Sequence, residues 1–205
     1  MRHLQPDLLD YLQEKKKYGQ ASWFFQTDRI EPFAYAEIFT PAQCKTIIQI
    51  GKNAILDTAT VFNGDSLCRK SRTSWLSPAD GNEWIFQKLT DTAMFLNDRF
   101  FKFDLLGFAE GIQFTEYESP GGKYDPHVDS MYNGKIRKLS ISVQLSDENE
   151  YEGGDVICNY GNEVVMPRTQ GTALAFPSYA LHGVKPVTKG TRYSLVAWIT
   201  GPQFK

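Results

Sequence analysis

The chain of 205 residues is 41% hydrophobic and 22% charged, and its net charge is −2. This composition supports one ordinary domain with a full core and excludes a largely disordered chain. The small net charge offers no basic patch, and no apolar run approaches the roughly 20 residues of a membrane span, so we expect neither nucleic acid nor a membrane as a partner.

The cysteines and the N-terminus predict the compartment. Cys44, Cys68 and Cys158 are odd in number and far apart, a pattern typical of thiols in a reducing environment. The first residues lack the apolar core of a secretory signal. We therefore expect a soluble, cytoplasmic protein.

Three segments in the first half have helical periodicity. Residues 4–17 place leucines on one face and end in three lysines before a glycine. A second helix is predicted from Thr40, where Pro41 suits the first turn and Gln43 completes a capping box. A third helix is predicted after Ser77-Pro78 and runs towards residue 100.

After residue 105 the hydrophobic period changes from 3.6 to 2. Strands are predicted at 110–117, 138–146, 154–159, 163–166, 172–176 and 191–199. Helices followed by short strands without helical crossovers indicate an α+β fold, with a double-stranded β-helix (jelly-roll) core and N-terminal helices packed on one sheet. We expect a single domain over 1–205, with helical support over about 1–105 and the jelly roll over about 106–200.

Two of the chain's histidines occur in a metal-binding pattern. His127 and Asp129 are two residues apart, so on an extended chain they point the same way. His182 follows the apolar segment 172–176. Two imidazoles and one carboxylate on neighbouring strands form the facial triad that holds Fe(II) and leaves positions open. Taken singly, each histidine is equally well explained as an ordinary loop or strand-end residue.

A basic residue follows ten positions after His182. Strand alternation places Arg192, Ser194 and Trp198 on one face. An arginine inside a barrel is costly unless it meets an anion. That anion is either an internal carboxylate or the far end of a dicarboxylate cosubstrate.

Five separated blocks occur in an order that resembles a known family. They are Tyr117-Glu-Ser-Pro-Gly-Gly-Lys-Tyr124-Asp-Pro-His127-Val-Asp129, then Leu145-Ser-Asp, Glu152-Gly-Gly-Asp155, His182-Gly-Val and Arg192. Over about residues 33–200 the chain resembles the iron- and 2-oxoglutarate-dependent dioxygenases, and within them the prolyl 4-hydroxylase branch. Two earlier segments, Arg72-Thr73-Ser74-Trp75-Leu76 and Glu110-Gly111-Ile112-Gln113-Phe114, are also similar to that branch.

The resemblance implies a function and a set of site residues. The metal ligands would be His127, Asp129 and His182, with Fe(II), 2-oxoglutarate and O2 as the reactants and ascorbate as a reductant for oxidised iron. The cosubstrate pocket would contain Arg192, Tyr117, Tyr124, Trp198, Gln144 and Ser142. Gln144 stands where oxygen-sensing relatives have a tyrosine, and Arg192 stands where collagen-type relatives usually have lysine.

The resemblance also implies contacts with the substrate. Glu110, Arg137, Arg72 and Ser74 match positions that contact or adjoin the peptide in related prolyl hydroxylases, and segments 60–76 and 130–137 are candidates for a lid. The leading expectation is a procollagen-proline 4-dioxygenase-like hydroxylase whose partner is a proline-containing peptide or protein.

Three alternatives remain open at this point. The same chemistry would serve a lysyl residue, a free amino acid or another small molecule. A non-catalytic jelly-roll binding module would keep the fold without the reaction. A zinc hydrolase would use the same ligand types, although it gives Arg192 no role.

Overall fold

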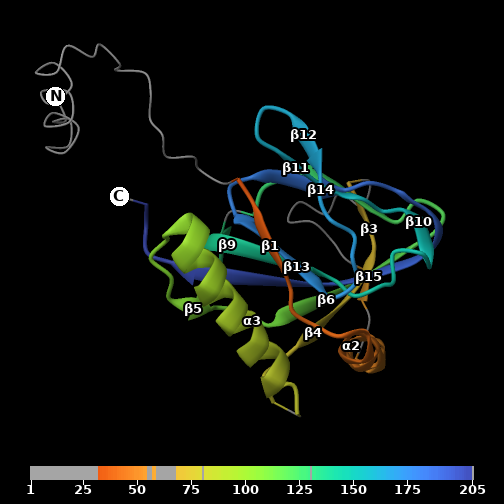
Figure 1. Ribbon diagram of the computed structural model, residues 1–205, viewed down its shortest axis with the longest axis horizontal. Coiled ribbons are helices and arrows are strands. Elements are labelled where there is room, and N and C mark those ends of the chain that lie inside the picture. The colour runs from red at the N-terminus through yellow and green to blue at the C-terminus, as the bar shows by residue number, and fades with distance from the viewer. Residues whose placement is uncertain (1–31, 55–56, 59–67, 80, 130, 205) are drawn as a thin grey trace, which may run out of the picture. The chain divides into compact units, whose positions relative to one another are not determined.

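The computed structural model describes residues 32–54, 57–58, 68–79, 81–129 and 131–204 (Figure 1). Two antiparallel sheets form the framework. The larger sheet has the order β1 (Ala34–Glu37), β13 (Thr172–Pro177), β9 (Lys135–Gln144), β15 (Val187–Gly201), β6 (Ile112–Glu118), β4 (Arg72–Leu76) and β2 (Asp57–Thr58). Further short strands pair beside this path: β5 (Gly107–Phe108) and β10 (Tyr151–Gly153) on β15, and β8 (Met131–Tyr132) on β9.

The smaller sheet carries most of the metal site. Its order is β12 (Glu163–Val165), β11 (Val156–Asn159), β14 (Leu181–Val184), β7 (Lys123–His127) and β3 (Arg69–Lys70). We call the space between the two sheets the interior. Strands β14 and β7 are neighbours in this sheet. His127 and His182, which are 55 residues apart in the sequence, therefore lie side by side.

Two helices cover the outer face of the larger sheet: α2 (Pro41–Asn53) and α3 (Glu83–Leu96), which continues into the π-helical turn η1 (Asn97–Phe101) (Figure 1). Their apolar residues join those of the sheet in the main core cluster, which includes Ile47, Leu89, Phe114 and Ile141, all with no exposed area. Alternation along the strands separates this apolar face from the opposite one, which faces the interior and carries polar side chains together with a second apolar cluster that includes Leu174 and Phe176.

The start of α2 agrees with the capping box predicted from the sequence. The Thr40 hydroxyl accepts a hydrogen bond from the Gln43 backbone N–H, and the Gln43 side chain accepts one from the Thr40 backbone N–H. Thr40→Ala removes the first of these bonds. We expect it to lower the free energy of unfolding by about 1 kcal/mol, measured by urea denaturation.

A second threonine on the same helix provides the control. Thr46 lies in the helix interior, where its hydroxyl donates to the Ala42 carbonyl oxygen. Such back-bonding contributes little to helix stability. Thr46→Ala should therefore change the free energy of unfolding by much less than Thr40→Ala, and equal losses would show that the cap is not the stabilising element.

The predicted fold class is confirmed, and two details differ from the sequence expectation. The first half is not only helical support, because β1, β3 and β4 lie within it and join the sheets. The strands β7 and β14 were absent from the predicted set, because they are short and contain Pro126 and Gly183, which weaken a strand pattern. The helix predicted over 4–17 lies outside the described residues. No helix within the described ranges is long and apolar enough to cross a membrane.

Candidate metal centre and active site

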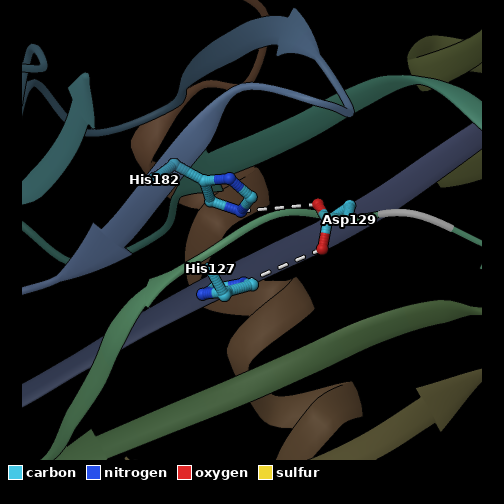
Figure 2. A group of neighbouring side chains, drawn as sticks. All are labelled: His127, Asp129 and His182. Atoms are coloured by element: carbon cyan, nitrogen blue, oxygen red, sulfur yellow. Dashed lines mark ion pairs between the residues drawn. The ribbon is translucent and has the colours of Figure 1, made fainter.

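The three predicted metal ligands converge on one point in the interior (Figure 2). Strand pairing sets His182 of β14 opposite His127 of β7, and Asp129 follows two residues later. The Asp129 oxygens lie 3.7 Å from His127 Nε2 and 3.4 Å from His182 Nε2. The ligand atoms of all three side chains lie within 4.8 Å of one another.

A glycine allows β14 to approach β7 this closely. The pairing shifts register between His182 and Val184, so Gly183 lies against the β7 backbone. A Cβ at Gly183 would lie 2.9 Å from the Tyr124 backbone oxygen, closer than carbon tolerates. Gly183 therefore permits the local geometry that faces both histidines towards Asp129.

Both histidines present the same ring nitrogen to the site. The Nδ1 atom of His127 is 2.9 Å from the Asp125 carbonyl oxygen, and that of His182 is 2.9 Å from the Ala180 carbonyl oxygen. Because a carbonyl only accepts, each Nδ1 carries the proton and each Nε2 keeps its lone pair. Burial, and then the neighbouring His182, lower the pKa of His127 to about 4, which favours the neutral form that binds metal.

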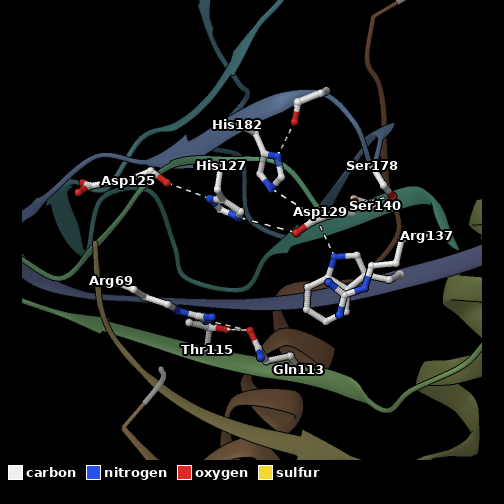
Figure 3. A network of polar contacts seen from close by, with 12 residues as sticks. Arg69, Gln113, Thr115, Asp125, His127, Asp129, Arg137, Ser140, Ser178 and His182 are labelled. Atoms are coloured by element: carbon white, nitrogen blue, oxygen red, sulfur yellow. Dashed lines mark hydrogen bonds and ion pairs between the residues drawn. The ribbon is translucent and has the colours of Figure 1, made fainter. Parts of the chain in front are cut away.

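Two neutral donors hold one oxygen of Asp129. Ser140 Oγ and Trp198 Nε1 donate to Oδ2 at 2.7 and 2.8 Å, and Asp129 is buried (Figure 3). The other oxygen, Oδ1, accepts neither of these bonds. Two neutral imidazoles and one fixed carboxylate, with no fourth protein ligand in the described part of the cluster, fit the Fe(II) facial triad and leave positions for other ligands.

The indole of Trp198 provides a test of this outer contact. Trp198→Phe removes the N–H that donates to Asp129 while keeping an aromatic ring in the interior. Changing such an outer partner typically weakens metal binding by about 10- to 100-fold. We expect that loss in a Fe(II) titration, with Ser140 still holding the carboxylate.

Trp75 offers a matched control for this variant. Its ring lies 6.0 Å from that of Trp198, and its side chain is half-exposed. The structure records no hydrogen bond from Trp75 to Asp129. Trp75→Phe should leave Fe(II) affinity unchanged, and an equal loss in both variants would attribute the effect to ring packing.

Arg192 lies fully inside the barrel, as alternation predicted. It is 1% exposed, and its guanidinium donates to Gln144 Oε1 from Nε at 3.2 Å and from Nη2 at 2.7 Å. Ser194 accepts a weaker bond at 3.4 Å, and the Tyr117 ring lies 5.4 Å away. No carboxylate from the described residues pairs with it, so the internal ion pair considered from the sequence is not present there.

The other predicted cosubstrate residues line the same interior. Tyr117 lies opposite Arg192 on β6, and Ser142 lies between Ser140 and Gln144 on the same face of β9. Tyr124 stacks on His127 with 3.6 Å between ring centres, and burial raises the pKa of its hydroxyl. Gln144 also donates to the Pro167 carbonyl oxygen at 3.0 Å, so its amide orients Arg192.

Glu110 and Arg137 contact each other. Arg137 donates to both oxygens of Glu110, at 2.7 and 2.6 Å, and Glu110 is nearly fully buried. The guanidinium also lies 3.9 Å from the Trp198 ring centre. The Glu110–Arg137 pair therefore lies beside Trp198, which donates a hydrogen bond to Asp129. A direct contact of either residue with the substrate stays a prediction.

Arg72 and Ser74 lie on a strand beside the site, but they face away from the triad. Arg72 pairs with Glu116 at 2.5 Å, and Ser74 donates to the Gly51 carbonyl oxygen of α2 at 2.9 Å. Since Ser74 bonds to helix α2 and Arg72 lies on the same side of β4 by alternation, both side chains lie on the helix-covered face of the strand. Alternation gives the interior face to Thr73 and Trp75 instead.

The sequence analysis did not predict one positively charged side chain in the interior, that of Arg69. Arg69 on β3 is 9% exposed and lies opposite Tyr124. A two-residue strand has no readable period, so nothing in the local sequence distinguished this arginine from the basic residues beside it.

The proposed lid segments are only partly described. Residues 59–67 lie outside the described ranges. In the other segment, β8 and β9 form a hairpin through Asn133-Gly134, both with positive φ, as a type I′ turn requires. Met131 is exposed on this hairpin. A lid function for either segment stays a prediction.

Comparison with known proteins gives the class that this fold and site define. Residues 112–200, which include the three ligands and Arg192, match the family model described as the 2OG-Fe(II) oxygenase superfamily. This part of the chain is therefore similar to that superfamily, and it contains the groups that would hold Fe(II) and 2-oxoglutarate.

The curated proteins similar to this chain include several named PKHD-type hydroxylases. One from Picosynechococcus sp. is 40% identical over 43% of this chain and 41% of its own length. One from Colwellia psychrerythraea is 28% identical over 80% of this chain and 75% of its own length. The chain thus spans about two fifths of the first of these relatives.

Solved structures confirm the fold. A Pseudomonas putida prolyl-4-hydroxylase has a TM-score of 0.66 at 18% identity and covers 84% of this chain and 94% of its own. A Trichoplax adhaerens prolyl hydroxylase, in complex with a hypoxia inducible factor peptide fragment, has a TM-score of 0.68 at 14% identity and covers 97% and 94%. At these identities the likeness establishes the double-stranded β-helix fold alone.

Proposed function

We propose that the chain is an Fe(II)- and 2-oxoglutarate-dependent hydroxylase acting on a prolyl residue of a peptide or protein. The observation that carries the proposal is the pairing of a facial triad with a buried arginine that has no carboxylate partner among the described residues. A zinc hydrolase needs the two histidines and the carboxylate, but the buried arginine has no role in its reaction. Prolyl hydroxylases among the solved relatives support the choice of target residue.

The metal and cosubstrate would be held by different groups. His127, Asp129 and His182 would hold Fe(II). When bound, Fe(II) with 2-oxoglutarate and O2 supplies the oxidising chemistry that hydroxylates a C–H bond and releases succinate and CO2. Ascorbate would keep the metal reduced.

The chain's own residues would position the reactants. Arg192 offers a planar fork to the distal carboxylate of 2-oxoglutarate, and Gln144 holds that fork from one side. Tyr117 closes the pocket beside the guanidinium. Burial of these groups excludes water, which strengthens every charge interaction within the interior.

Anaerobic titration of the Fe(II)-loaded protein with 2-oxoglutarate tests the chemistry. Chelation of the metal by the keto acid should produce a weak visible charge-transfer band. Proline-rich peptides should then yield succinate and gain one oxygen atom, detected by mass spectrometry. A folded, iron-loaded protein that shows no band would lose the cosubstrate assignment, and the binding-module interpretation would take its place.

The same chemistry on a lysyl residue, a free amino acid or another small molecule is the second candidate. Its support is the second interior arginine, Arg69, which the cosubstrate does not need. A substrate panel that contains free amino acids beside peptides separates the two candidates.

A further inference from the structure

Arg69 places a second positive charge inside the barrel, next to the metal ligands. Its guanidinium lies 4.6 Å from the Tyr124 ring centre, and that ring stacks on His127. Figure 3 shows the side chain directed into the interior towards Gln113 and Thr115, with the triad on the opposite side of the space. Arg69 therefore faces the same interior space as the three metal ligands.

The hydrogen bonds of Arg69 leave its charge unpaired. Nε donates to Ser71 Oγ at 2.8 Å, and Nη2 donates to Gln113 Oε1 at 2.9 Å. Both partners are neutral, and Nη1 donates to no described residue. A guanidinium stays charged at every physiological pH, so a buried one needs an anion or water.

The carboxylates of the surrounding segments are paired with other cations or, like Asp129, belong to the metal site. Glu110 pairs with Arg137, Glu116 with Arg72 and Asp125 with Lys123. No carboxylate from the described residues lies within 4.0 Å of Arg69. Arg69 is thus a cation, nine-tenths buried, whose missing counterion has to come from outside these residues.

The cosubstrate does not fill this role if Arg192 anchors it. One carboxylate of 2-oxoglutarate would lie at the metal and the other at Arg192, so no negative group remains for Arg69. Arg69 and Arg192 lie on different sheets, on β3 and β15, and contact different tyrosines, Tyr124 and Tyr117. They are therefore two separate cationic positions in the interior.

We infer that Arg69 binds a carboxylate of the substrate that is hydroxylated. The inference rests on the proposed hydroxylase chemistry and narrows the substrate class for both candidate substrates. A carboxylate accepts two parallel hydrogen bonds from the planar guanidinium and also neutralises its charge. A peptide carbonyl oxygen accepts hydrogen bonds but leaves the charge unneutralised. The carboxylate belongs to a free amino acid, to a C-terminal residue or to an acidic side chain beside the target.

A panel of matched ligands distinguishes these sources. The pairs are L-proline and L-prolinamide, a peptide with a free C-terminal proline and its amide, and a peptide with internal aspartate and its asparagine counterpart. Binding is measured anaerobically by perturbation of the visible band of the Fe(II)–2-oxoglutarate protein. We expect the carboxylate member of one pair to bind about 10- to 100-fold more tightly.

Variants then assign that preference to Arg69. Arg69→Met should abolish the preference and leave the 2-oxoglutarate titration unchanged, while Arg69→Lys should retain part of it. Lys70→Met is the matched control, because Lys70 lies on the same strand, is exposed and donates to the Pro120 carbonyl oxygen. Lys70→Met should keep the full preference.

Several results would overturn the inference. Equal binding within every pair, or a preference retained in Arg69→Met, would remove Arg69 from substrate recognition. A weakened 2-oxoglutarate titration in Arg69→Met would instead make Arg69 a cosubstrate contact. If no band forms even in the unmodified protein, the proposed function fails, and ligand stabilisation of the metal-free protein against heat still tests the carboxylate preference.

Discussion

Asp129→Asn is expected to abolish Fe(II)-dependent turnover while leaving the fold intact. The introduced amide would keep an oxygen that accepts from Ser140 and Trp198, so neither buried donor loses its partner. Its NH2 group would replace Oδ1 and offer the metal no negative ligand. The loss of Fe(II) affinity should exceed the roughly 10- to 100-fold that changing an outer partner costs.

The measurement pairs metal binding with stability. Fe(II) titration and succinate formation should both fall to background in Asp129→Asn, whereas urea denaturation of the metal-free protein should change little. Asp129→Ala serves as the contrast. It leaves the buried Trp198 N–H unpaired, at a cost of about 1–3 kcal/mol, whereas the Ser140 hydroxyl keeps the Ser178 hydroxyl as a partner. Turnover at the original rate in Asp129→Asn would remove this residue from the ligand set.

The metal site was predictable from the sequence because its residues follow simple geometry. His127 and Asp129 are two residues apart, and His182 follows an apolar strand that had to be buried. Arg192 was predictable for the same reason, since alternation along a long central strand fixes which residues face inward. The apolar run of β13 and the alternation of β15 therefore predicted the core and the inward direction of Arg192, whereas His127 and His182 were found from their residue types and spacing.

The residues around the substrate position were less predictable. Alternation separates Arg72 and Ser74 from Thr73 and Trp75, but only the pairing of β4 with β6 decides which set faces the interior. In β7 the stacked residues Tyr124 and His127 are three positions apart, because the pairing with β14 is irregular. A period of two cannot reveal such contacts.

The second large effect is expected at Arg192. Arg192→Met should raise the 2-oxoglutarate concentration required for half-maximal turnover. A desolvated charge pair of this kind contributes about 2–5 kcal/mol, and each 1.4 kcal/mol is about tenfold. The increase should therefore be between about 30-fold and several thousand-fold.

Two further variants make this result specific. Arg192→Lys keeps the positive charge but loses the planar guanidinium that Gln144 orients. The 2-oxoglutarate concentration that this variant requires should therefore lie between that of the original protein and that of Arg192→Met. Lys189 is an exposed cation on the same strand, paired with Glu152 at the surface. Lys189→Met should leave the 2-oxoglutarate requirement unchanged.

The comparison of Arg192 with Arg69 decides how the interior charges are used. Both guanidiniums are buried, and both donate only to neutral groups among the described residues. If Arg192 anchors the cosubstrate, Arg192→Met weakens the 2-oxoglutarate band and Arg69→Met does not. The reverse pattern would exchange the two roles, since the chain would still hold two interior cations for two carboxylates. An unchanged requirement in both variants would contradict an arginine anchor altogether.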